Sequence, residues 1–185
     1  MSLDSSGVES AIRRFFINTI FDATFTVMGV ISGSAFTGDV KTVLVTLFSS
    51  SIALGISSGV SVYEAETLEE EKRLEELEKA LIVDLEGTRL ERDVARKALR
   101  VASVILVTPL IPSTITSIPL FASFFGVIAL RQAAFISIGL ALSTLLVIGV
   151  LMATDGRRAK ILKGLRMAFF GAIAFLIGYA LESLL

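Results

Sequence analysis

The sequence predicts an all-α, polytopic membrane protein of five transmembrane helices, with a cytoplasmic helical hairpin between spans two and three. The composition is the first reason: 54% of the 185 residues are hydrophobic and 19% are charged, against about 25% charged in soluble domains. The distribution of charge is the second: residues 42–63 carry no charge, and residues 101–153 carry only Arg131. Such runs are long enough to cross a bilayer.

The first two spans make up residues 1–63. The first apolar segment runs from about residue 11 to residue 35, and the second from residue 43 to residue 63. A cleavable signal peptide is an alternative for the first segment, because Ser34 and Ala35 are small. The segment is longer than the apolar core of such a peptide and contains Asp22, so we expect it to span the membrane.

Residues 64–97 form the predicted hairpin. They are rich in Glu, Lys and Arg, lack proline, and contain a single glycine, Gly87, where we expect the turn. Leu74, Leu77 and Leu81 recur at helical spacing, so the second helix is expected to continue out of the membrane with one apolar stripe.

Spans three to five make up residues 98–185. The third span contains Pro109 and Pro112, with Pro119 near its end, so we expect it to be kinked. The fourth ends at about Ala153. Five basic residues then precede the fifth span, which ends at Leu185.

Basic residues predict the orientation, because short cytoplasmic loops are enriched in Lys and Arg. With a cytoplasmic N-terminus, only Lys41 and Arg131 lie outside, and the other basic residues lie in the cytoplasm. Five spans then place the C-terminus outside. We therefore expect a multi-pass protein of the cell membrane.

The residue types that are absent exclude several functions. The chain has no cysteine and no histidine, which excludes disulfides, thiol catalysis and imidazole chemistry. No glycine-rich phosphate loop or known catalytic motif is present, so no enzymatic activity and no organic cofactor are expected. No basic stripe with interleaved aromatic residues indicates nucleic-acid binding. Amides are rare, with only Asn18 and Gln132, which favours a thermophilic source.

Asp22 is the residue most indicative of function. A carboxylate in the middle of a span costs about 2.5–3.5 kcal/mol on insertion scales. Asp22, Thr26, Gly29 and Gly33 share one helical face, which we expect to point into the bundle and to serve an ion pathway or a proton relay. The alternative is a buried aspartate that only hydrogen-bonds a neighbouring helix.

The second span has a similar stripe. Thr46, Ser50 and Ser57 lie at helical spacing, so their hydroxyls are candidates to face Asp22. Gly55 and Gly59 form a small-xxx-small pair. The alternative is that these small residues only allow close helix packing.

The hairpin contains more acidic than basic residues, and carboxylates suit hard divalent cations. The alternative is a solvated helix with i,i+4 ion pairs, namely Glu69 with Arg73, Glu75 with Lys79 and Asp93 with Lys97. The candidate metal ligands are Asp22, Glu64, Glu66, Glu69, Glu70 and Glu76.

Three stretches carry a resemblance to a known family: residues 21–33 (FDATFTVMGVISG), residues 51–59 (SIALGISSG) running into the acidic helix, and residues 162–171 (LKGLRMAFFG). With this order of features the chain resembles the vacuolar iron transporter family, as a divergent prokaryotic, archaeal member. Thr46 and Leu54 align where the family commonly has a glutamate and a methionine.

The resemblance implies a homodimer that moves Fe²⁺, and often Mn²⁺, out of the cytoplasm in exchange for protons. Asp22 would be the transport carboxylate, and the acidic helices would gather metal. The alternative from another class is a non-transporting membrane scaffold or regulatory subunit whose hairpin docks a partner.

Overall fold

The described part of the protein is built from six α-helices. The computed structural model describes residues 3–35, 38–82, 89–152 and 156–184, and no strand occurs in these ranges. The expected turn at Gly87 lies outside them. The helices are α1 (Leu3–Ser34), α2 (Val40–Leu81), α3 (Arg89–Val107), α4 (Leu110–Phe124), α5 (Leu130–Leu151) and α6 (Arg157–Leu184).

Five helical segments are long and apolar enough to cross a membrane, which confirms the predicted number of spans at the level of length and composition. The segments are Gly7–Ser34, Val40–Ala80, Val94–Phe124, Leu130–Leu151 and Arg157–Leu181. The third segment combines α3 and α4. The chain is therefore a multi-pass membrane protein by its helix content.

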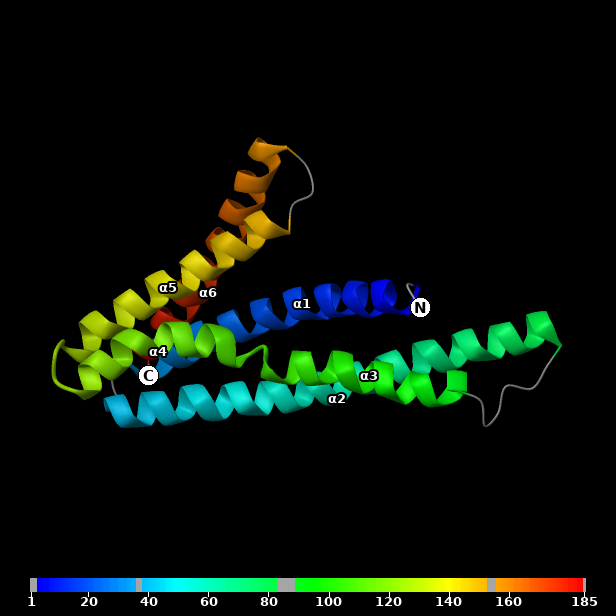
Figure 1. Ribbon diagram of the computed structural model, residues 1–185. Coiled ribbons are helices and arrows are strands. Elements are labelled where there is room, and N and C mark those ends of the chain that lie inside the picture. The colour runs from blue at the N-terminus through cyan, green and yellow to red at the C-terminus, as the bar shows by residue number, and fades with distance from the viewer. Residues whose placement is uncertain (1–2, 36–37, 83–88, 153–155, 185) are drawn as a thin grey trace.

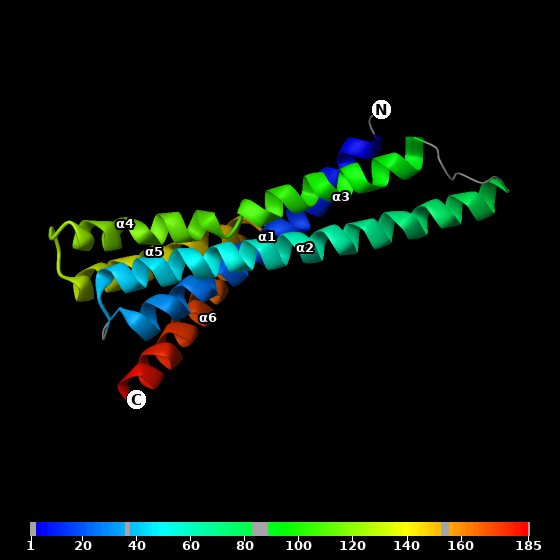
Figure 2. The same ribbon diagram turned by 90° about the horizontal axis from the view of Figure 1, so that it is seen from below.

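The start of α1 and the end of α6 lie toward opposite ends of the bundle (Figures 1 and 2). The end of α1 meets the start of α2 at the end of the bundle where α4 also meets α5. The last turns of α2 and the first turns of α3 project together from the other end, whereas α5 and α6 pair and lean away from α2 (Figure 1).

α2 is one continuous helix of 42 residues. Asp39 caps its N-terminus by accepting a hydrogen bond from the Thr42 backbone N–H at 2.9 Å. At the other end Ile82 adopts a left-handed conformation with φ of 54°, and its N–H bonds to the Glu78 carbonyl. This helix extends beyond its uncharged stretch, residues 42–63, into the acidic segment.

The third span is broken at Thr108 and Pro109, which confirms the predicted kink. Pro109 has no N–H to continue the α-helical ladder. Instead, the Thr108 N–H bonds to the Ile105 carbonyl and the Ile111 N–H to the Thr108 carbonyl, each at 3.1 Å. Pro112 lies in the first turn of α4, where N–H groups have no helical partner. Pro119 lies inside α4 without ending it.

The core lies where α1, α2, α4 and α5 meet. Its fully buried side chains include Met28, Ile31, Leu47, Leu120 and Leu145. Hydroxyl groups are buried beside it: Ser51 hydrogen-bonds Ser113, and Ser137 donates to the Thr116 carbonyl at 2.7 Å. These contacts give the buried hydroxyl groups hydrogen-bond partners, which the hydrocarbon of a membrane cannot supply.

Candidate functional site

The face of α1 that carries Asp22 points outward in the single chain, so the expectation that it points into the bundle is wrong for one copy. Asp22, Gly29 and Gly33 are exposed. A Cβ added at either glycine would meet nothing within 4 Å. The reason is that the opposite face of α1 carries Val27, Met28 and other apolar side chains of the core, whose burial is more favourable.

The Asp22 carboxylate has no hydrogen-bond or ion-pair partner among the described residues. The Thr26 hydroxyl donates to the Asp22 backbone carbonyl at 2.8 Å, a bond within the helix. The carboxylate oxygens are therefore available to a ligand.

The predicted polar stripe of α2 also reaches the surface. Thr46 and Ser57 are exposed, and Ser50 is half-buried. α1 and α2 pack against each other, but within the described ranges no hydrogen bond joins Asp22 to Thr46 or Ser50. Two neighbouring helices thus each expose polar groups at span depth.

Gly55 and Gly59 lie where α2 meets α3. A Cβ at Gly55 would overlap the Leu106 carbonyl oxygen, and one at Gly59 would lie 3.1 Å from the Leu106 Cβ. The absence of side chains at both positions lets the two backbones approach closely. The two glycine pairs therefore differ, since a Cβ added at Gly29 or Gly33 would meet no described atom within 4 Å.

An alternating chain of six charges joins α1, α2 and α3 beyond the uncharged stretch of α2. In order, the distances are 3.3 Å for Glu66–Arg14, 3.6 Å for Arg14–Glu69, 3.3 Å for both Glu69–Arg73 and Arg73–Glu70, and 2.6 Å for Glu70–Lys97. A cavity of about 230 Å³ lies among them. Glu66 and Lys97 are the buried members.

This charge chain uses three of the predicted metal ligands, Glu66, Glu69 and Glu70, as partners of basic groups. Glu64 and Glu76 are exposed. No group of three or more acidic side chains is placed to hold one metal ion in the part of the chain that the structure describes.

Of the expected i,i+4 pairs, Glu69–Arg73 and Glu75–Lys79 are present, the latter at 2.7 Å. The Asp93 side chain lies outside the described residues. Its expected partner Lys97 bonds Glu70 of α2.

Burial raises the pKa of the Glu66 carboxyl, and the charge of Glu69 raises it further, while Arg14 opposes both. Exposed Glu75 is the opposite case: the hydrogen bond from Lys79, and then its charge, lower the pKa of this carboxyl. The two glutamates of α2 therefore couple folding to pH with opposite signs.

We expect Glu66→Gln to gain stability relative to the unmodified protein as the pH rises. A raised pKa gives a stabilisation that is complete below the unfolded-state pKa and is lost as the pH passes the folded-state pKa. The Gln side chain does not ionise, so the variant does not lose this stabilisation as the pH rises. Thermal unfolding in detergent, followed by circular dichroism between acidic and neutral pH, measures the difference.

Glu75→Gln is the matched control and should change in the opposite direction. Its lowered pKa stabilises the fold above the unfolded-state value, and this contribution is lost as the pH falls. If Glu66→Gln instead loses relative stability with rising pH, attraction to Arg14 outweighs the penalty of burial.

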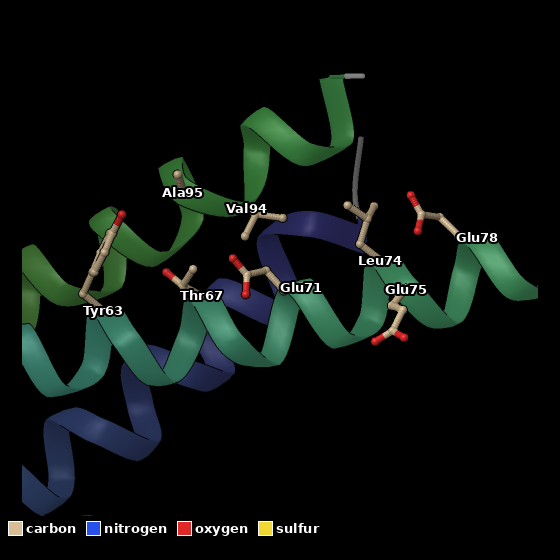
Figure 3. Close-up of a pocket in the computed structure, with 8 residues that line it drawn as sticks. All are labelled: Tyr63, Thr67, Glu71, Leu74, Glu75, Glu78, Val94 and Ala95. Atoms are coloured by element: carbon tan, nitrogen blue, oxygen red, sulfur yellow. The ribbon is translucent and has the colours of Figure 1, made fainter. Parts of the chain in front are cut away.

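A cavity of about 450 Å³ lies between the projecting parts of α2 and α3, and the sequence did not predict it. In Figure 3, Thr67 and Glu71 point toward Val94 of α3, and Glu75 points away. The Thr67 hydroxyl is buried without a partner among the described residues. Glu71, Glu75 and Glu78 recur at i, i+4 and i+7 of α2, and this spacing was the available signal.

Comparison with known proteins finds a distant relative. The chain is 24% identical over 164 residues to an uncharacterized protein of Methanocaldococcus jannaschii, covering 89% of this chain and 84% of the relative. No protein-family profile matches the chain. The similarity therefore covers most of both proteins and is not limited to one segment.

Proposed function

We propose that the chain transports a divalent metal cation, Fe²⁺ or Mn²⁺, and exports it from the cytoplasm in exchange for protons. One observation carries the proposal: Asp22 is an exposed carboxylate at mid-span with no partner among the residues that the structure describes. An intramembrane acid in this state indicates an ion pathway, because its insertion is costly unless a cation, a proton or water compensates the charge.

The ligand chemistry of this face favours hard cations. Asp22 supplies carboxylate oxygens, and in this proposal Thr46 and Ser50 of the neighbouring helix α2 add hydroxyl oxygens. Oxygen ligands suit Mn²⁺ and Fe²⁺, whereas a site without imidazole or thiolate disfavours Zn²⁺ and Cu²⁺. Thr26 shares the face of Asp22, and its hydroxyl oxygen can act as a ligand because its proton is donated to the helix backbone and its lone pairs remain free.

The working unit in this proposal is a homodimer. A single chain would expose Asp22, Gly29 and Gly33 to lipid, which is unfavourable for the acid. Small residues on a membrane helix allow a second helix to approach closely. A second copy that packs on this face of α1 would cover the stripe and enclose the cation between two carboxylates.

Because the chain has no cysteine, single cysteines can test the dimer. We expect Gly29→Cys and Gly33→Cys to form covalent dimers in membranes with a short thiol cross-linker. Gly139→Cys is the control, since Gly139 of α5 is equally open. Equal cross-linking at all three positions would contradict a specific interface on α1.

The projecting acidic segment serves as the cytoplasmic entry in this proposal. Exposed Glu64 and Glu76 raise the local concentration of cations, as do the acids that line the cavity in Figure 3. Glu66, Glu69 and Glu70 hold the three helices together through the charge chain. The N-terminus is cytoplasmic and the C-terminus outside, in line with the basic residues.

Metal flux into proteoliposomes tests the proposal. We expect liposomes that contain the protein to accumulate Mn²⁺ or Fe²⁺ under an opposing proton gradient, and the internal pH to change with metal entry. Protein-free liposomes are the control. Metal flux without any change of internal pH would rule out exchange for protons. Absence of metal flux would rule out the transport function.

A membrane scaffold or regulatory subunit is the second candidate. The charge chain favours it, because ion pairs occupy three of the acids expected to bind metal. Its projecting helices would then dock a soluble partner. Calorimetry with Mn²⁺ separates the candidates, since a scaffold binds no stoichiometric metal at Asp22.

A further inference from the structure

The start of α6 is a strongly basic surface. Arg157, Arg158, Lys160, Lys163 and Arg166 occur within ten residues, and no acidic residue follows before Glu182. Four of the cations are exposed and Lys163 is half-buried. None has an acidic partner among the described residues, unlike the cations of the charge chain.

Two of these cations lie within the length that α6 needs to cross a membrane. The uncharged stretch between Arg166 and Glu182 has only fifteen residues, which corresponds to about 22 Å of helix at about 1.5 Å per residue. A hydrocarbon core is about 30 Å thick and needs about 20 residues. The crossing segment therefore extends beyond this stretch, so Arg166, and Lys163 one turn before it, lie at the edge of the hydrocarbon, where their side chains reach the lipid headgroups.

The same turns expose apolar side chains between the cations. Leu162 is 69% exposed, Leu165 57% and Phe169 64%. The guanidinium of Arg166 lies 5.8 Å from the ring centre of Phe170, one turn further along the helix. A surface on which cationic and apolar side chains alternate suits a ligand with an anionic end and apolar chains.

Packing leaves this surface free on the side away from α5. Gly164 faces α5, where a Cβ on Gly149 would lie 2.7 Å from the Gly164 Cα. The close contact fixes the rotation of α6 about its axis. The cations on the other faces are thus held in place at the membrane boundary.

We propose that this surface, residues 157–166 of α6, binds the headgroup of an anionic phospholipid in the adjacent leaflet, with Lys163 and Arg166 contacting the phosphate. Charge complementarity identifies the occupant, because the described protein supplies no counter-charge and the boundary supplies phosphate. Retention of basic residues on one side during insertion accounts for Arg157 and Arg158 at the start of α6. It does not require unpaired cations at the edge of the hydrocarbon.

Native mass spectrometry of the protein in detergent mixed with phosphatidylglycerol or phosphatidylcholine tests the inference. We expect bound phosphatidylglycerol in clear excess over phosphatidylcholine. Lys163→Gln/Arg166→Gln should weaken phosphatidylglycerol binding by about 25-fold, since each basic residue near an anionic surface contributes about a factor of five. Lys72→Gln/Lys79→Gln is the control with the same change of charge, in the projecting part of α2.

The conservative variant Lys163→Arg/Arg166→Lys should retain the preference, and it keeps the inference testable if the neutral variant does not fold. Equal binding of the two lipids to the unmodified protein would overturn the inference. Displacement of phosphatidylglycerol by millimolar inorganic phosphate would also overturn it, because that result indicates a site for free anions. The result does not depend on whether the protein transports metal.

Discussion

Asp22→Asn is expected to reduce metal uptake by proteoliposomes to near the background of protein-free vesicles. Asn keeps the size and one oxygen of the side chain but loses the negative charge that compensates a cation in the bilayer. A contact to a charged group is worth up to about 3 kcal/mol, which corresponds to a decrease of about 100-fold. The initial rate of Mn²⁺ entry measures the effect.

Glu9→Gln is the matched control for Asp22→Asn. It removes one negative charge from an exposed residue of the same helix, close to its N-terminal end. We expect this variant to retain the uptake rate. Equal rates for Asp22→Asn and the unmodified protein would show that the carboxylate has no part in transport.

Gly55→Ala is expected to cause the largest loss of stability among small substitutions in the membrane helices. The added methyl group would overlap the carbonyl oxygen of Leu106, a backbone atom that cannot move without shifting α3. Overpacking of this kind typically costs about 1–3 kcal/mol. Thermal unfolding in detergent, followed by circular dichroism, should show a lower midpoint temperature.

Gly139→Ala is the control for Gly55→Ala, because a Cβ at Gly139 meets nothing within 4 Å. Alanine is favoured over glycine in a helix by about 1 kcal/mol, so this variant should be as stable as the unmodified protein or more stable. A similar loss in both variants would contradict the close contact between α2 and α3.

Local sequence features predicted the spans and the kink well. The spans follow from uncharged runs that are visible in the sequence itself. Pro109 ends α3 in any surroundings, because it has no backbone N–H to continue the helical hydrogen bonds. The pairs Glu69–Arg73 and Glu75–Lys79 were predictable for the same reason, since helical spacing alone brings them together.

Contacts between helices were not predictable in this way. Helical spacing placed Asp22 and Gly29 on one face of α1, but packing of Met28 and Ile31 against other helices decides which face is buried. Spacing along the sequence paired Lys97 only within its own helix and did not predict its bond to Glu70 of α2. That bond depends on the close packing of α2 and α3, which Gly55 and Gly59 allow further along the two helices.

The continuous helix α2 lies beside a helix pair that is jointed at Thr108 and Pro109. Its 42 residues correspond to about 63 Å at about 1.5 Å per residue. If a straight helix of this length tilted by about 5°, one end would move relative to the other by about 5 Å. Because α2 is unbroken, a force on its acidic tip would be transmitted along the whole helix, whereas the neighbouring pair of α3 and α4 is interrupted at Thr108 and Pro109.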